Sequence, residues 1–360
     1  MKNLHISTPG RICLFGEHQD YLGLPVIAAA ISRRIHIEGS VTNEPSIHIE
    51  LPDIHSSETF QLSEAELYQK DRDYFKSVLN VLKREKGIEL KQGVKAKVHG
   101  NIPINSGTSS SSALVVAWTH LLLRITNQII DPVEIGRLAY LAEVEEFGEP
   151  GGCMDEYATS IGNIMYLETS PTTVAEAYQA PLGKFVLGDS LEPKDTIGIL
   201  KHVKFGMLEA IEKIKKVFPE FQLNQAPIES AEQYKSLLSK DEYALFYSNL
   251  SDRDILRSAK KMFEGKEEFN DAKLGQLLSA HQDNLRDAKR VSTPKINRMI
   301  NAAISAGALG GKINGSGGGG CMFAYAPTNT EDVVEAIEKE GGKAYIIEVA
   351  EGTREEQPHL

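Results

Sequence analysis

The serine-rich stretch 103–113, PINSGTSSSSA, contains residue types that bind phosphate. A glycine, a threonine and four consecutive serines lead directly into the apolar run LVVAW, so a small polar loop ends where a helix should begin. The first turn of a helix has free backbone N–H groups and the positive end of a dipole. A simple N-cap needs only one serine, so this run favours an anion site. The loop predicts phosphate contacts from Ser106, Gly107, Thr108, Ser109, Ser110 and Ser111.

A second stretch, PGRICLFGEHQDYLGLP at 9–25, is rich in side chains that ionise or donate hydrogen bonds. A structural turn needs glycine but not so many polar groups, and binding residues concentrate on loops. The alternative is a solvated charged turn. The stretch predicts a functional loop with the candidate residues Arg11, Glu17, His18, Asp20 and Tyr21.

Two acidic residues further along the chain are candidates for metal binding. The tetrapeptide 131–134, DPVE, starts a predicted helix that runs to about Phe147. Helical spacing places Glu143 beside Ala139, at the edge of the buried side. A carboxylate there is unfavourable unless it is paired or binds a metal. Glu146 lies toward the same side of the predicted helix and is the alternative metal ligand.

Asp155 follows the turn Pro150-Gly151-Gly152. An acid at such a turn can be a structural cap, or a general base within hydrogen-bond reach of a substrate hydroxyl. The residues alone leave both interpretations open.

Seven glycines occupy positions 310–320, GGKINGSGGGG, ahead of the apolar run 321–325. Because glycine loses much backbone entropy on folding, a mere turn explains this run poorly. Close approach of the backbone to a ligand or to another loop explains it better.

The chain's three cysteines, Cys13, Cys153 and Cys321, have no CxxC spacing, which disfavours zinc and disulfides. Each lies in or next to a glycine-bearing stretch, which indicates that these stretches meet.

Bulk properties exclude some classes of function. The chain has 360 residues, 41% of them hydrophobic and 25% charged, with a net charge of −11. A length of 360 residues predicts two domains. An acidic chain is a poor binder of nucleic acids or of anionic membranes, which need a basic face. No apolar run approaches a membrane span and the N-terminus lacks the apolar core of a signal peptide, so we expect a cytoplasmic protein.

The elements that must position these residues follow from apolar periodicity and turn residues. A domain boundary is expected near the strand at 183–188, the region 196–289 should be mostly helical, and the tail Glu351–Leu360 should fray. The predicted strands are 4–12, 26–38, 46–51, 93–99, 163–167, 183–188, 321–325 and 344–349. The predicted helices include 64–86, 206–218, 231–238, 258–263, 273–288, 296–306 and 331–339.

The three glycine-bearing stretches, in this order, resemble the GHMP kinases, the superfamily of galactokinase, homoserine kinase, mevalonate kinase and phosphomevalonate kinase. PGRICLFGEHQDYLG is similar to the galactokinase signature, PINSGTSSSSA to the phosphate-binding loop and GGKINGSGGGGC to the C-terminal glycine motif. The resemblance implies an α+β, two-domain GHMP kinase fold with the active site in the cleft between the domains. Residues 1–185 would form a ribosomal-S5-domain-2-like N-terminal domain, and residues 186–360 a ferredoxin-like C-terminal α/β domain.

The resemblance also implies roles for single residues. Asp155 stands where galactokinases carry the aspartate that abstracts the sugar hydroxyl proton, and Arg11 matches the arginine that pairs with it. Glu143 matches the metal-binding glutamate and would hold Mg²⁺ with Ser110 or Ser111. ATP would lie against the serine loop and the glycine run, including Gly317 and Gly318. The sugar-binding run is matched by Glu17, His18, Asp20 and Tyr21.

Some residues depart from the galactokinase pattern. Cys13 replaces an asparagine and Glu156 a glutamine, and the segment 188–204, GDSLEPKDTIGILKHVK, lacks the tyrosine and paired arginines that help to hold the sugar. As a whole, the resemblance implies an ATP- and Mg²⁺-dependent kinase for the anomeric hydroxyl of galactose or a related sugar. The alternatives are a GHMP kinase for a non-sugar alcohol such as mevalonate, and a non-catalytic sensor of sugar and ATP.

Overall fold

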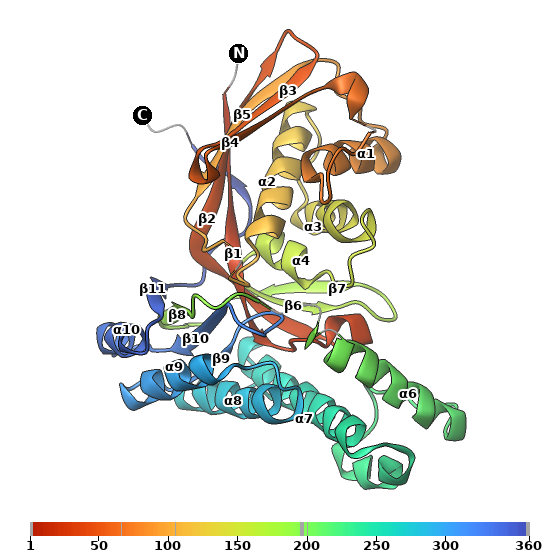
Figure 1. Cartoon of the computed structure of the whole chain (residues 1–360), viewed down its shortest axis with the longest axis vertical. Coiled ribbons are helices and arrows are strands. Elements are labelled where there is room, and N and C mark those ends of the chain that lie inside the picture. Colours follow the sequence, from red (N-terminus) through yellow and green to blue (C-terminus); the bar gives the residue numbers. More distant parts are fainter. Residues whose placement is uncertain (1–2, 66, 105, 195–197, 200, 358–360) are drawn as a thin grey trace.

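The computed structural model describes residues 3–65, 67–104, 106–194, 198–199 and 201–357. Within these residues the strands form a sheet of eight and a sheet of four, with helices packed against both (Figure 1). The strands are β1 (Leu4–Phe15), β2 (Val26–Thr42), β3 (Ser46–Leu51), β4 (Ser56–Gln61), β5 (Gly93–Gly100), β6 (Ile164–Glu168), β7 (Val174–Tyr178), β8 (Phe185–Asp189), β9 (Gly310–Ile313), β10 (Cys321–Tyr325), β11 (Lys343–Ile347) and β12 (Arg354–Glu355). The helices are α1 (Tyr74–Lys86), α2 (Ser110–Ile125), α3 (Pro132–Tyr140), α4 (Met154–Ile161), α6 (Gly206–Val217), α7 (Lys240–Phe263), α8 (Asp271–Asp283), α9 (Pro294–Ser305) and α10 (Thr330–Lys339).

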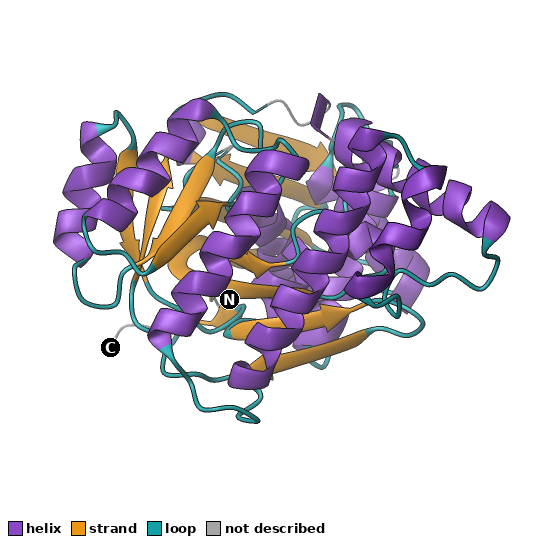
Figure 2. Cartoon of the chain, turned by 90° about the horizontal axis from the view of Figure 1, so that it is seen from below, coloured by secondary structure: helices purple, strands orange, loops and turns teal. Residues whose placement is uncertain are grey.

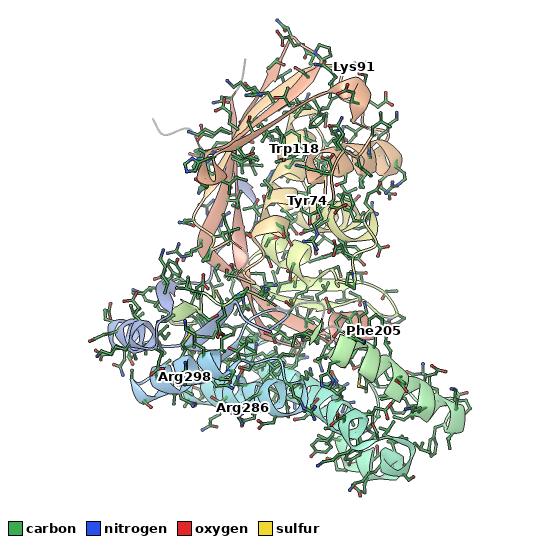
Figure 3. The ribbon with its side chains drawn as sticks, viewed as in Figure 1. Tyr74, Lys91, Trp118, Phe205, Arg286 and Arg298 are labelled. Atoms are coloured by element: carbon green, nitrogen blue, oxygen red, sulfur yellow. The ribbon has the colours of Figure 1, made fainter. Side chains whose placement is uncertain are left out.

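The larger sheet has the strand order β12-β1-β2-β5-β3-β4, and β6 and β7 extend it from β2. Its described pairings are antiparallel except that of β3 with β5. Helices α1, α2 and α3 pack on one face, around the buried indole of Trp118, which Figure 3 labels. The Trp118 indole N–H donates to the backbone oxygen of Phe75 at 3.1 Å, so the polar atom of this buried ring is satisfied.

The smaller sheet is antiparallel with the order β11-β8-β10-β9, which is the strand order of a ferredoxin-like fold. Strand β10 is buried along its whole length. Successive side chains of a strand point to opposite faces. Phe323 packs with α7 and α8 on one face, and Met322 packs with α9 and α10 on the other. Figure 2, which views the chain from below, shows the helices in front of the strands.

The α+β class expected from the sequence is confirmed. The predicted helix 64–86 is wrong before Tyr74, because Arg72 has a left-handed φ of 57° that a right-handed helix cannot include. Four strands, β4, β7, β9 and β12, and the helix α4 were not predicted. Part of the region predicted to be mostly helical, residues 196, 197 and 200, lies outside the described residues.

The prediction that the tail frays is wrong for most of its described part. Strand β12 pairs with β1, and Glu351 bridges to Gly162. The Ser7 hydroxyl donates to Glu356 at 2.5 Å, so the chain end returns to the larger sheet. Residues 358–360 lie outside the described residues. We keep the division into domains 1–185 and 186–360 as a proposal, in which the C-terminal tail returns to pair with a strand of the first domain.

No helix in the described part of the chain is long and apolar enough to cross a membrane.

Candidate active site

Six chain segments meet around one cavity of about 820 Å³. They are β1 with the turn after it, the start of α1, the loop between β5 and α2, the segment from the end of α3 to the start of α4, the segment after β8, and the glycine run between β9 and β10. Asn314 joins three of them, since its Oδ1 accepts from the Cys13 backbone N–H at 2.9 Å and its Nδ2 donates to the Gly107 oxygen at 2.8 Å. The expectation that the glycine-bearing stretches meet is therefore confirmed.

Arg11 and Asp155 both line this cavity and are in direct contact with each other. The Nε of Arg11 donates to Oδ1 of Asp155 at 2.8 Å, and its Nη2 donates to Oδ2 at 2.7 Å. A further N–H group of the guanidinium donates to the Gly107 oxygen. Burial works against the charge of Arg11, but the neighbouring Asp155 outweighs it and raises the pKa of Arg11. The Asp155 side chain keeps 30% of its surface exposed, so this oriented carboxylate is open to a substrate.

The local backbone explains why Arg11 reaches this position. The β1–β2 pairing shifts register between Pro9 and Arg11, and such irregularities redirect side chains. The freed backbone N–H of Arg11 donates to the oxygen of Thr108 at 3.2 Å. Asp155 lies in the first turn of α4. The arginine therefore ties a strand, a helix start and the serine loop together.

The turn after β1 forms the second end of the cavity. His18 has a left-handed φ of 63°, and its Nε2 donates to the oxygen of Ser316 at 3.0 Å. Its Nδ1 then accepts from the Tyr21 hydroxyl at 2.9 Å. Burial, together with the positive charge of Lys289, lowers the pKa of His18 to about 4. The imidazole is therefore neutral at pH 7.

Asp20 lies beside His18 and Tyr21 in the same turn. Burial raises the pKa of Asp20 to about 6, although the Tyr21 backbone N–H donates to its Oδ1 at 2.9 Å. A methyl group on Gly152 would lie 1.7 Å from Oδ2 of Asp20, so a side chain there would displace this carboxylate. The glycine pair before Asp155 thus makes room for an acid of the opposite loop.

Glu17 points away from solvent into a buried charged network. Its carboxylate pairs with Lys312 and lies 3.7 Å from Nδ1 of His281. On the far side, Nε2 of His281 lies 3.5 Å from Asp252, and Asp252 pairs with Lys289 at 2.8 Å. All five side chains are at most 1% exposed. Sequence patterns do not reveal this network, because its members lie far apart in the chain.

The serine loop has two kinds of residue. Ser106 and Thr108 bond to each other and to the oxygen of Pro103, so their hydroxyls hold the loop itself. Ser109, which precedes α2 with a left-handed φ of 60°, has a buried hydroxyl oxygen without a hydrogen-bond partner. The loop residues that line the cavity are Gly107, Ser109, Ser110, Ser111 and Ser112, and Ser112 was missed in the sequence.

Glu143 lies in a π-helical turn, Leu141–Glu145, that interrupts the predicted helix. Such turns redirect side chains and are frequent at functional sites. Burial raises the pKa of Glu143, while the hydroxyls of Ser111 and Ser112 and the carboxyl group of Glu156 act in the opposite direction. Burial and the charge of Glu143 raise the pKa of Glu156 well above its usual range.

These acids fit a divalent cation. Glu143 and Glu156 each have a buried Oε2 without a hydrogen-bond partner, and oxygen ligands suit Mg²⁺. The alternative ligand Glu146 faces elsewhere, because its oxygens accept from the Tyr68 hydroxyl at 2.5 Å and pair with Arg84 at 3.0 Å. The geometry thus separates Glu143 from Glu146 as a candidate ligand.

The glycine run contacts mainly other backbone segments. Gly318 N–H donates to the oxygen of Val291 at 2.8 Å, and a methyl group on Gly317 would lie 2.6 Å from the Val291 Cβ. Neither glycine lines the cavity, whereas Gly315 and Ser316 do. Nucleotide contacts by Gly317 and Gly318 stay a prediction.

Family models match three parts of the chain. Residues 73–163 match "GHMP kinases N terminal domain", and residues 262–345 match "GHMP kinases C terminal". Residues 2–41 match "Galactokinase galactose-binding signature".

Curated relatives cover nearly the whole chain. The chain is 31% identical to a mevalonate kinase of Thermococcus gammatolerans over 98% of each sequence. It is 30% identical to a galactokinase of Thermococcus kodakarensis over 89% of each. Among solved structures, Lactococcus lactis galactokinase with galactose matches with a TM-score of 0.85 at 22% identity, over 98% of this chain and 95% of that one. Methanococcus jannaschii mevalonate kinase matches with a TM-score of 0.74 at 20% identity, over 97% and 99%. These two structures show the fold.

Proposed function

The chain belongs to the GHMP kinases and is an ATP-dependent phosphotransferase acting on an alcohol group, and we propose that this alcohol is the anomeric hydroxyl of a sugar. The products would be a sugar 1-phosphate and ADP. Galactose or a related sugar is the proposed substrate, in agreement with the galactose-binding signature matched at residues 2–41.

The charge pattern at the turn after β1 carries this proposal. Asp20 offers carboxylate oxygens, and the Tyr21 hydroxyl, which donates to His18, keeps a lone pair, so both can accept from neutral hydroxyl groups. A substrate carboxylate would need an unpaired cation here. Three cations described near this end are already engaged, since Arg11 pairs with Asp155, Lys312 with Glu17 and Lys204 with the oxygen of Pro150. Lys194, which also lines the cavity, lies against the serine loop and the glycine run. A neutral polyol therefore fits this end better than an organic acid.

In the proposed reaction, Asp155 accepts the proton of the attacking hydroxyl. The sugar oxygen forms a bond to the γ-phosphorus as the bond from that phosphorus to the ADP oxygen breaks. Arg11 keeps the carboxylate oriented through two hydrogen bonds, and each carboxylate oxygen retains a lone pair for the proton. This positioning turns an encounter of two reactants into an aligned transfer.

The start of α2 would hold the phosphates of ATP. Its first turn has free backbone N–H groups and a positive dipole end, and Ser110 and Ser111 line the cavity there. Glu143 with Ser111, and Glu156 beside them, would hold Mg²⁺, which supplies neutralisation of phosphate charge. The unpartnered buried oxygens of the two glutamates support this assignment.

A mevalonate kinase is the second candidate. The observation that favours it is the 31% identity to the Thermococcus gammatolerans mevalonate kinase over 98% of each chain. Mevalonate carries a carboxylate, so this candidate requires that carboxylate to pair with Lys194, or one of the engaged cations to exchange its partner on binding.

The test is ADP formation by the purified protein with Mg²⁺ and a panel of free sugars, uronic acids, amino sugars and mevalonate. We expect turnover with a neutral hexose and at least a hundredfold lower kcat/KM for mevalonate. A pocket that hydrogen-bonds a polyol strongly rejects a ligand that leaves the polar groups of the pocket unpaired. Preferred turnover of mevalonate would refute the sugar proposal and establish the second candidate.

A further inference from the structure

Lys194 occupies the space between the serine loop and the glycine run. A methyl group on Gly107 would lie 2.9 Å from its Nζ, and one on Gly320 would lie 3.0 Å from its Cε. Both glycines have left-handed φ angles, of 87° and 77°. Two positions without side chains therefore leave a channel in which the lysine reaches the phosphate-binding loop.

The segment after β8 is fixed to the glycine run by backbone hydrogen bonds. The Ser190 N–H donates to the oxygen of Gly320 at 2.9 Å, and the Gly320 N–H donates to the oxygen of Glu192 at 3.2 Å. The carboxylate of Glu192 accepts from the Thr293 hydroxyl at 2.6 Å. Pro193 packs against Gly319, where a methyl group would lie 2.4 Å from its oxygen. Lys194 thus extends from an anchored backbone, so its ammonium is delivered to a defined place.

Lys194 differs from the other described cations around the cavity in its lack of a carboxylate partner. Among the lining cations that the structure describes, Arg11 pairs with Asp155, and Arg72 pairs with Glu149 at 2.7 Å. No described carboxylate lies within 4.0 Å of the Lys194 ammonium. Burial and the charge of Arg11 lower the pKa of Lys194, although the charge of Asp155 acts in the opposite direction. A half-buried ammonium beside another cation is unfavourable until an anion joins it.

We propose that Lys194 is a further catalytic residue, whose ammonium contacts the phosphoryl group that ATP transfers. The group carries charge on its outer oxygens during transfer, and a cation placed in advance lowers that barrier without later reorganisation. Asp155 and Arg11 lie beside the same point, at which the acceptor hydroxyl and the phosphorus must meet. This role depends on the transfer of a phosphoryl group from ATP, which the family carries out, and not on the identity of the alcohol that accepts it.

The experiment compares Lys194→Ala and Lys194→Arg with the wild-type protein. Lys201→Ala is the matched control, because Lys201 is an exposed lysine of the next segment, outside the cavity lining. Dissociation constants are measured by calorimetry for ADP and for the β,γ-imido analogue of ATP, each with Mg²⁺. The kcat is measured with the preferred acceptor, and a thermal melt checks folding.

We expect Lys194→Ala to lower kcat by about a hundredfold, the usual effect of removing one such donor. It should weaken the imido analogue about tenfold more than ADP, because only the analogue carries the third phosphate. Lys194→Arg should recover most of both losses, and Lys201→Ala should match the wild type. Equal weakening of ADP and analogue, or a kcat within twofold of the wild type, would overturn the proposal. Should Lys194→Ala not fold, Lys194→Met, which keeps the aliphatic stem, gives the same comparison.

Discussion

The pair of Arg11 and Asp155 illustrates how single residues set the chemistry. A carboxylate takes a proton efficiently only when its lone pair already faces the donor. The two hydrogen bonds from the guanidinium, at 2.8 and 2.7 Å, fix the plane of Asp155 and prevent its rotation. The residues alone left the role of Asp155 undecided between a helix cap and a general base, because no local pattern pairs residues 11 and 155. The family resemblance implied the general base.

Asp155→Asn is expected to lower kcat by roughly a thousandfold, because the amide keeps the shape of the side chain but cannot accept the proton. The affinity for ATP should stay within about twofold of the wild type, since Asp155 belongs to the acceptor side. Steady-state kinetics and nucleotide titration check both expectations. The matched control is Asp131→Asn at the start of α3, where asparagine also caps a helix. A rate for Asp155→Asn near that of the control would contradict the role as base.

Glu143→Gln should raise the Mg²⁺ concentration needed for half-maximal activity by about tenfold or more, because an amide oxygen is a weaker ligand than a carboxylate. Binding of Mn²⁺ to the protein, followed by electron paramagnetic resonance, gives a readout that is independent of turnover. Glu146→Gln is the control, since Glu146 bonds to Tyr68 and Arg84 outside the cavity. A metal titration that moves for Glu146→Gln and not for Glu143→Gln would transfer the role to Glu146.

The pKa of Asp20 predicts a pH dependence. Its value of about 6 lies above the ordinary 3.8, so the folded chain keeps this proton where the unfolded chain loses it. The contribution of Asp20 to stability therefore falls as pH rises from about 4 to about 6. Since only the ionised carboxylate accepts two substrate hydroxyls, kcat/KM for the acceptor should rise through about pH 6. Asp20→Asn should remove both effects, and an unchanged pH profile in this variant would show that another group titrates.

At the scale of elements, the turn after β1 is held by charged side chains of α7, of β9 and of the segment that follows α8. Lys289 donates from Nζ to the backbone oxygen of Glu17 at 3.1 Å and pairs with Asp252. Lys312 pairs with the Glu17 carboxylate and donates to the oxygen of Cys13 at 3.0 Å. The network thus connects the larger sheet to the helices that cover the smaller one. It also fixes the backbone from which His18 projects.

Removing one member of a buried ion pair leaves the other charge without compensation, which costs about 3–5 kcal/mol of stability. Glu17→Gln and Lys312→Met should each lose stability of this size in urea unfolding. The double variant should lose clearly less than the sum of the two single losses, since it leaves neither charge alone. Additive losses would show that the two side chains do not act as a pair.

Much of the element arrangement could be predicted from the sequence. The alternation and apolar runs of β3 and β10 gave their bounds, because these strands are bounded by clear turn residues. The start of α1 could not be predicted, because the left-handed Arg72 interrupts a helical pattern without a glycine or proline. The five-member network was also invisible, because its partners lie up to 295 residues apart. Lys194 was missed because its segment departs from the family pattern.

At the scale of the whole molecule, the two sheets share one hydrophobic core. Ile12 and Phe15 of β1 pack with Phe185 and Phe323 of the smaller sheet and with Leu278 of α8. Strand β1 therefore extends from the core under α2 to the core above α8 (Figure 1). The cavity lies where these two layers meet, and it is lined by the acid of α4, the serine loop and the glycine run.

The central claim is that this chain transfers phosphate from ATP to the anomeric hydroxyl of a sugar. The most direct measurement follows, in one reaction with the preferred sugar, the ADP formed and the reducing ends that remain. Phosphate on the anomeric oxygen blocks the reducing end, so we predict the loss of one reducing end for each ADP formed. Formation of ADP with all reducing ends intact, or phosphate transfer to mevalonate but to no sugar, would contradict the account.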